Sequence, residues 1–130
     1  GFYDLALRAA SNSLASSALP PGSTTTSQLV ASLDAGVAAI RQYGNAQVGD
    51  RTMLDALIPA IEAMRGAASV QEAIKAGAAA ATSGAQATSS MVALAGRSSY
   101  LSASQVSGVA DPGATAASVW FNAIATSIAE

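Results

Sequence analysis

The sequence has no histidine and no cysteine among its 130 residues. Serine or cysteine nucleophiles paired with histidine, zinc sites on these side chains, thiol redox chemistry and disulfides are therefore excluded. Any metal ion bound by these residues would have to be held by oxygen ligands. Aromatic residues are also scarce, at 5% of the chain, whereas we count 33 alanines and 18 serines. Small side chains in such numbers favour closely packed helices and argue against a β-sandwich.

Charge is sparse as well, because charged residues make up 11% of the chain and the formal net charge is -2. The six basic residues are scattered along the sequence, at Arg8, Arg41, Arg51, Arg65, Lys75 and Arg97. Nucleic acids are bound by a clustered basic face, which this spacing does not provide. We therefore expect no nucleic-acid partner. The hydrophobic content of 51% indicates one small globular domain.

A run of 21 uncharged residues lies between Lys75 and Arg97 and is long enough to cross a bilayer. The run consists mostly of alanine, glycine, serine and threonine, with few large apolar side chains. We interpret it as a buried or interfacial helix rather than a membrane span. The chain does not open with a basic segment followed by a leucine-rich core, so nothing marks a secretory signal. We expect a cytoplasmic protein with no membrane partner.

Apolar residues recur at helical spacing along most of the chain. With capping and stop signals, the spacing predicts five helices, at residues 2–17, about 24–44, 53–64, 69–95 and from 111 onward. Pro59 stands inside the third helix and should kink it or lie in its first turns. Gly77 and Gly84 inside the fourth helix each cost about 1 kcal/mol relative to alanine. That cost is tolerable where a neighbouring helix must approach closely.

The last two helices carry clear signals at their ends. Ser69 and Glu72 form the pattern of a capping box at the start of the fourth helix, and Gly96 is expected to stop it. Asp111 is the expected N-cap of the last helix, with Pro112 at its first helical position. The candidate buried positions of the last helix are Val119, Phe121, Ile124 and Ile128.

Five helices and one structured loop over residues 97–110 make this an all-α fold. A domain of this size buries only about 60–70% of its unfolded surface, and alanine contributes little per residue. We therefore expect its amphipathic faces to need a partner segment, either a preceding N-terminal part of the same domain or another subunit.

Generic phosphate-binding fingerprints such as GxxxxGK[ST] are absent, and three polar loops remain as candidate functional segments. They are GDRTMLDAL at 49–57, GRSSYL at 96–101 and DPGA at 111–114. Each has a structural interpretation: Asp50 or Thr52 caps a helix while Arg51 is solvated, and an arginine after a helix C-terminus complements the helix dipole. Each also has a functional interpretation, because N–H groups at a helix start beside an arginine can face an anion such as phosphate. Taken singly, the loops favour the structural interpretation.

In this order and at this spacing, with Thr88 and Met91 ahead of the second motif, the three motifs resemble the nucleotide-binding domain of dihydroxyacetone kinases, called the L subunit or DAK2 domain. The segment YDLALRAA near the start and the stretch from Asp34 to Gly44 also resemble the fused single-chain members of this family. The resemblance therefore extends over essentially the whole chain. It implies that residues 1–130 are the C-terminal part of an L-type, ATP-binding domain.

The resemblance implies an antiparallel helical barrel that binds ATP or ADP at one rim. The γ-phosphoryl group would pass to dihydroxyacetone or glyceraldehyde on a separate K domain or subunit, where the ketone is held as a covalent adduct to a histidine. The parent protein would be a kinase of glycerol metabolism that forms a homodimer. Fused eukaryotic members also cyclise FAD to FMN, and the same nucleotide site would serve that reaction. The sequence does not separate the two activities.

Matching the motifs position by position gives the candidate nucleotide-binding residues, which are Gly49, Thr52, Ile58, Arg97, Asp111, Pro112 and Gly113. By this resemblance, Gly49 and the helix that it opens, with Thr52 and Ile58, would line the nucleotide pocket. Ile58 stands where some relatives have methionine. Arg97 would contact the charged part of the nucleotide, in a motif where Ser98 replaces a more usual alanine. The Asp-Pro-Gly segment would close over the nucleotide.

Two motifs of the family are missing, a D-G-D-x-G loop and a Gly-Gly-Ser/Thr-Ser-Gly helix start. The resemblance assigns Mg²⁺ binding to the first and phosphate binding to the second. We therefore expect the Mg²⁺ ligands in a preceding segment of the same domain, and we assign no catalytic or metal-binding residue here. Phosphoryl transfer depends on positioning and on charge neutralisation, so the 130 residues alone should be inactive. Two alternatives stay open: a non-catalytic helical scaffold or regulatory module that retains the fold, and a weaker one, a membrane or interface helix bundle without a ligand.

Overall fold

The computed structural model describes residues 1, 4, 8–9, 12 and 25–129. The helix expected over residues 2–17 therefore lies almost entirely outside the described residues. The described part contains helices and no strand, which confirms the predicted all-α class. The α-helices are α2 (Thr26–Gly44), α3 (Leu54–Met64), α4 (Val70–Ala87), α5 (Ala103–Val106) and α6 (Pro112–Ala129), and the 3₁₀ helices are η1 (Thr88–Ser90) and η2 (Arg97–Tyr100).

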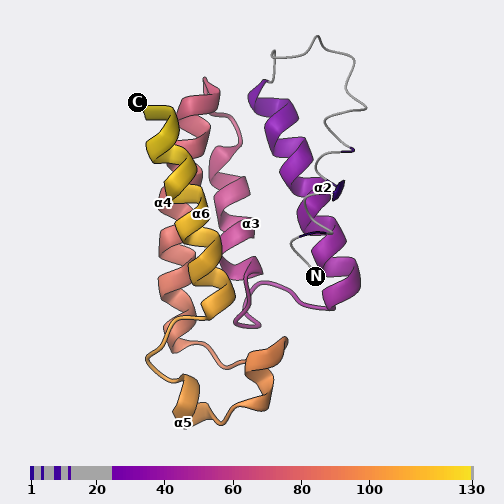
Figure 1. The fold of residues 1–130 in the computed structure, drawn as a ribbon, viewed down its shortest axis with the longest axis vertical. Coiled ribbons are helices and arrows are strands. Elements are labelled where there is room, and N and C mark those ends of the chain that lie inside the picture. The colour runs from indigo at the N-terminus through magenta and orange to yellow at the C-terminus, as the bar shows by residue number, and fades with distance from the viewer. Residues whose placement is uncertain (2–3, 5–7, 10–11, 13–24, 130) are drawn as a thin grey trace.

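The four long helices form a bundle in which each runs antiparallel to the one before it (Figure 1). α4 packs against both α3 and α6, and α2 packs against α3. At one end of the bundle, here called the loop end, α2 and α4 finish while α3 and α6 begin. Residues 88–111, the connecting segment, join α4 to α6 at this end. Within the described residues, no helix combines the length and the apolar character needed to cross a bilayer.

The start and end of α2 follow from local sequence, as predicted. The Thr25 hydroxyl accepts a hydrogen bond from Gln28 N at 3.3 Å, and Thr25 N donates to Gln28 Oε1 at 2.9 Å, which completes a capping box. The helix ends at Gly44, where Asn45 adopts the left-handed conformation with φ of 46°. The predicted apolar stripe faces the core through Val30 and Ile40.

Small side chains fill the interface that α4 makes with its neighbours. The buried alanines are Ala56, Ala60, Ala73, Ala78, Ala81, Ala85, Ala114 and Ala117. A Cβ added at Gly84 would collide with the Asp55 carbonyl oxygen and lie 3.1 Å from Ala56 Cα, so the backbones of α3 and α4 meet there. A Cβ at Gly77 would lie 2.9 Å from Met64 Cγ. Both glycines therefore stand at close helix contacts, as expected.

Pro59 lies inside α3, at its sixth residue, and has no N–H to donate. The carbonyl four residues earlier, that of Asp55, consequently receives no bond from position 59. Gly84 packs against this same carbonyl. Pro59 and Gly84 therefore both affect the Asp55 carbonyl. Pro59 leaves this carbonyl without its helical donor, and Gly84 allows α4 to pack directly against it.

The predicted end of the fourth helix is wrong, since α4 stops at Ala87 rather than near residue 95. The hydroxyls of Thr88, Ser89 and Ser90 donate to the carbonyl oxygens three residues earlier, at 2.6, 2.8 and 3.0 Å respectively. These side chains replace the backbone donors of a further α-turn, and the chain tightens into η1. Gly96, with φ of 73°, directly precedes η2, so the prediction that it stops the fourth helix is wrong.

The buried face of α6 differs from the predicted one. Phe121 is 1% exposed, as expected, but Val119 is 63% exposed and its assignment to the core was wrong. Ile124 and Ile128 are partly buried against the core. The remaining buried positions of α6 are small residues, Ala114, Ala117 and Ser118. Spacing alone did not reveal this face, because alanine and serine carry no clear hydrophobic signal.

Candidate functional site

All three polar motifs meet at the loop end. A Cβ added at Gly96 would lie 4.0 Å from Thr52 Cγ2, and one added at Gly113 would lie 3.4 Å from Met53 Cβ. The backbone joins the segments as well, because Leu94 N donates to the Asp50 carbonyl oxygen at 3.1 Å. Segments that are more than 40 residues apart in sequence thus share one surface.

The turn before α3 is organised by a buried carboxylate. Asp55, which is 2% exposed, accepts hydrogen bonds from Gly49 N to Oδ1 at 2.6 Å and from Thr52 N to Oδ2 at 2.8 Å. The Thr52 hydroxyl accepts from Leu54 N at 3.2 Å, but the N-cap of α3 is Met53, which has no side-chain cap, so the prediction that Asp50 or Thr52 caps this helix is wrong. Asp50 instead accepts from Gln47 N, in the preceding turn. Sequence analysis missed Asp55, although the spacing of Thr52 and Asp55 is that of a capping box.

Gly49 presents open backbone at this turn. Its φ is 98°, a conformation that side chains other than glycine rarely adopt. A Cβ added there would meet nothing within 4 Å, so a ligand can approach the peptide from that side. Gly49 therefore has a backbone conformation that favours glycine, and its Cα faces open space.

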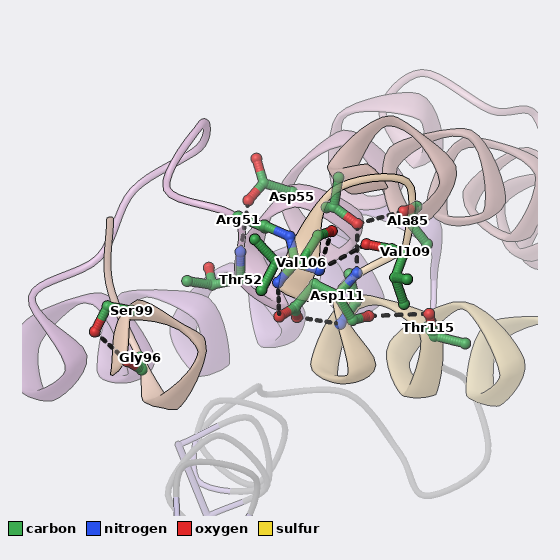
Figure 2. A network of polar contacts seen from close by, with 12 residues as sticks. Arg51, Thr52, Asp55, Ala85, Gly96, Ser99, Val106, Val109, Asp111 and Thr115 are labelled. Atoms are coloured by element: carbon green, nitrogen blue, oxygen red, sulfur yellow. Dashed lines mark hydrogen bonds and ion pairs between the residues drawn. The ribbon is translucent and has the colours of Figure 1, made fainter. Parts of the chain in front are cut away.

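Arg51 is buried, which contradicts the interpretation that it is solvated. Its side chain is 2% exposed and its φ is 61°, in the left-handed region. Nη2 donates to the Val109 carbonyl oxygen at 2.6 Å and to that of Val106 at 3.4 Å, and Nη1 lies 3.6 Å from Asp111 Oδ1 (Figure 2). No local pattern could have predicted this burial, because every partner is more than 50 residues away.

Asp111 caps α6, as predicted, and links it to α4. Its Oδ2 accepts from Ala114 N at 2.9 Å, and Pro112 occupies the first helical position. Asp111 N donates to the Thr88 hydroxyl at 2.7 Å, and that hydroxyl donates to the Ala85 carbonyl oxygen at 2.6 Å (Figure 2). Thr88 is fully buried. Thr88 precedes the GRSSYL motif in the family resemblance, but the sequence analysis predicted no function for it.

The other candidate residues lie at different places in the fold. Gly113 sits beside Met53, and Pro112 is exposed at the start of α6. Arg97 is the first residue of η2, and its side chain lies outside what the structure describes. Ile58 is partly buried against the core, about one helical turn beyond the start of α3. The structure thus brings the three loops together at the loop end, whereas Ile58 lies within α3, packed against the core.

A hollow of about 650 Å³ on the described surface adjoins the site at Asp50. It lies between the end of α2 and the turn that follows, and polar side chains such as Arg41, Gln42, Asn45 and Gln47 line it. Among the residues that the structure describes, no group of three or more carboxylates could hold a metal ion.

An all-helical domain with three polar motifs at one end of its bundle matches a known domain family. A family model of the DAK2 domain matches residues 1–126, and the chain belongs to this family. The resemblance seen in the motifs is thereby confirmed.

Named relatives and a solved structure agree with the family. The chain is 41% identical over 128 residues to human triokinase/FMN cyclase, covering 94% of this chain and 21% of that protein. It is 37% identical over 97 residues to DhaL, the ADP-binding subunit of the PEP-dependent dihydroxyacetone kinase of Escherichia coli, covering 72% of this chain and 46% of that one. The crystal structure of the dihydroxyacetone kinase of C. freundii superposes with a TM-score of 0.68 at 31% identity, over 97% of this chain and 20% of that chain. The chain thus spans about a fifth to a half of the length of these proteins.

Proposed function

We propose that these residues are part of the ATP-binding domain of a dihydroxyacetone or glyceraldehyde kinase, with the nucleotide held at the loop end. The γ-phosphoryl group would pass to a keto or aldehyde triose on a separate K domain or subunit. The observation that carries the proposal is the meeting of the three motifs around Gly49, Thr52 and Asp111. Membership of the DAK2 family and the ADP-binding role named for DhaL support it.

The loop end offers a nucleotide three kinds of contact. The open peptide at Gly49 allows phosphate oxygens or ribose to approach the backbone closely. The N-termini of α3 and α6 both point to this end, and their dipoles favour an anionic ligand. Arg97 would add a positive charge, as the family resemblance implies. Together these groups bind and orient a nucleotide rather than carry out covalent chemistry.

Exposed apolar side chains around the same end favour a second contact, with the domain that holds the triose. Val92, Leu94, Tyr100 and Val109 of the connecting segment are each more than half exposed. Exposed large apolar side chains are candidates for a protein–protein contact when they form a contiguous patch. The acceptor must lie against the γ-phosphate, so a K domain would dock at the loop end and cover these residues.

The described residues do not fit Mg²⁺ by themselves, because no carboxylate cluster among them could hold it. When bound to ATP, Mg²⁺ neutralises phosphate charge. In this proposal its ligands come from a preceding part of the domain. The residues described here hold the nucleotide, and no step of the transfer is assigned to them.

A matched pair of glycine variants in the full-length protein tests this function. Gly49 and Gly66 both have positive φ, and a Cβ on either would meet nothing within 4 Å, but Gly66 lies at the opposite end of the bundle. Gly49→Ala should weaken ADP binding about tenfold or more, or roughly 1.4 kcal/mol, in calorimetric titrations with and without Mg²⁺. Gly66→Ala should bind ADP as the wild type does. The proposal fails if the wild type ignores ADP, which would favour a non-catalytic scaffold, or if both variants bind equally well.

A further inference from the structure

Arg51 stands out in the loop end because it is fully buried and yet incompletely bonded. Its Nε and Nη1 atoms have no hydrogen-bond partner among the described residues, and the 3.6 Å separation from Asp111 Oδ1 is an ion-pair distance rather than a hydrogen bond. A well-packed apolar side chain often stabilises a fold as much as a buried ion pair does. Stability alone therefore does not account for an arginine here.

What the guanidinium provides is a connection between three separate elements. Arg51 itself belongs to the turn that opens α3. Nη2 bonds to the carbonyl oxygens of Val106 and Val109, where α5 ends, and Nη1 faces Asp111 at the start of α6 (Figure 2). A planar fork with donors in several directions makes these contacts at once, which the single ammonium group of lysine does not.

The same turn also holds the other end of the connecting segment. The Asp50 carbonyl oxygen accepts from Leu94 N at 3.1 Å, ahead of η2, while Arg51 holds the chain after α5. Between these two points, the side-chain hydrogen bonds of Ser99 and Ser102 are local, within the Gly96 turn and the Ser102 cap. Neighbouring residues of one turn therefore fix both ends of the stretch that carries η2.

We infer that Arg51 is a positioning residue of the nucleotide site: it sets η2 and the start of α6 against Gly49 and Thr52 without contacting the nucleotide itself. The inference rests on the proposed function, since it assigns Arg51 a role in that same site. Arg51 has the required reach and is too deeply buried to serve as a direct ligand. Its loss should loosen the connecting segment and leave the α3–α4 interior in place.

The test compares Arg51→Lys with Arg65→Lys in the full-length protein. Arg65 is a matched control because it also pairs with a carboxylate, Asp34, at 2.7 Å, but on the exposed surface where α3 ends. Arg51→Lys should weaken ADP binding about tenfold or more, with far-UV ellipticity unchanged. Amides of residues 94–110 should exchange hydrogen about tenfold faster or more, while those of α3 and α4 keep their protection. Arg65→Lys should match the wild type in both measurements.

A second variant keeps the inference open to refutation if Arg51→Lys folds poorly. Asp111→Asn retains an oxygen to accept from Ala114 N while removing the charge that faces Arg51. It should produce the same faster exchange, and its effect on ADP affinity should be less than additive with that of Arg51→Lys.

The outcomes separate this inference from the proposed function. If the wild type binds ADP but Arg51→Lys binds it equally well, the positioning role is wrong, whether or not the connecting segment loosens. Uniform loss of protection across α3 and α4 would show that Arg51 is simply a stability residue. If the wild type fails to bind ADP, the proposed function fails and the positioning role fails with it.

Discussion

The bundle interior and the loop end are held together by different kinds of contact, made by different residue types. In the interior, α4 presses alanines and glycines against α3 and α6, and burial of apolar surface holds the helices together. At the loop end, a few directional bonds from Arg51, Asp55 and Thr88 hold the chain. Interior contacts repeat every three or four residues along the helices, whereas each loop-end contact is an individual hydrogen bond or ion pair that occurs once.

Two glycines show this contrast most directly. Gly84 is needed because the backbone of another helix touches it, and its own conformation is ordinary. Gly49 is needed because its φ is 98°, and the space around it is open. One glycine serves packing and the other leaves a surface accessible. Three pairs of variants, taken from the largest expected effect to the smallest, test how far the contrast extends.

The largest effect is expected in the interior, on α6. Phe121→Ala removes a ring that is 1% exposed and should lower the free energy of unfolding by about 3–5 kcal/mol. Val119→Ala, two residues earlier on the exposed face, should stay within about 0.5 kcal/mol of the wild type. Urea denaturation followed by far-UV ellipticity measures both. Equal losses would mean that the assigned buried face of α6 is wrong.

The next effect comes from adding one methyl group to α4. Gly84→Ala places a Cβ against the backbone of α3, which cannot move aside, and should cost roughly 3 kcal/mol, the upper range for overpacking. At Gly77 the closest obstacle is the flexible side chain of Met64. Gly77→Ala should therefore change stability by about 1 kcal/mol or less, since helix propensity offsets part of the strain. Thermal and urea unfolding compare the two, and the reverse order would refute the assigned helix contact.

The smallest effect is expected at the loop end, from a nearly isosteric change. Thr88→Val removes the hydroxyl that accepts from Asp111 N and donates to the Ala85 carbonyl oxygen, and should cost about 1–2 kcal/mol. Ser90→Ala removes an exposed hydroxyl with one local bond and should change stability by less than about 0.5 kcal/mol. Hydrogen exchange should report the Thr88 loss first at the start of α6. If the core of α3 opens equally, the loop end is not a separate unit.

Sequence reasoning predicted those elements whose signals are local. The start of α2 near residue 24, its end at Gly44 and the Asp111 cap of α6 were all predicted, because helix ends are signalled by residues close together in the sequence. The α4 end was missed because three consecutive hydroxyls bond back to the helix carbonyls, an outcome that alanine-rich spacing does not reveal. Val119 was misassigned because small residues carry the buried stripe.

The candidate site was predictable as a set of motifs but not as an arrangement. The family resemblance predicted Gly49, Thr52 and Asp111 as nucleotide-binding residues, and the structure places their segments side by side. The burial of Arg51 could not be predicted, because its partners are backbone carbonyls and a carboxylate distant in sequence. Nothing in a polar motif distinguishes an arginine that faces solvent from one that faces inward.

The contact of Gly84 with the Asp55 carbonyl also limits how the molecule can move. If α4 slid along α3 by one turn, about 5–6 Å, Ala80 or Thr88 would take the place of Gly84. Either residue would bring a Cβ against the same carbonyl. The contact therefore fixes the axial register of α3 and α4, and a shift of one helix past the other by one turn is blocked. An adjustment to a ligand therefore does not involve sliding of α4 along α3.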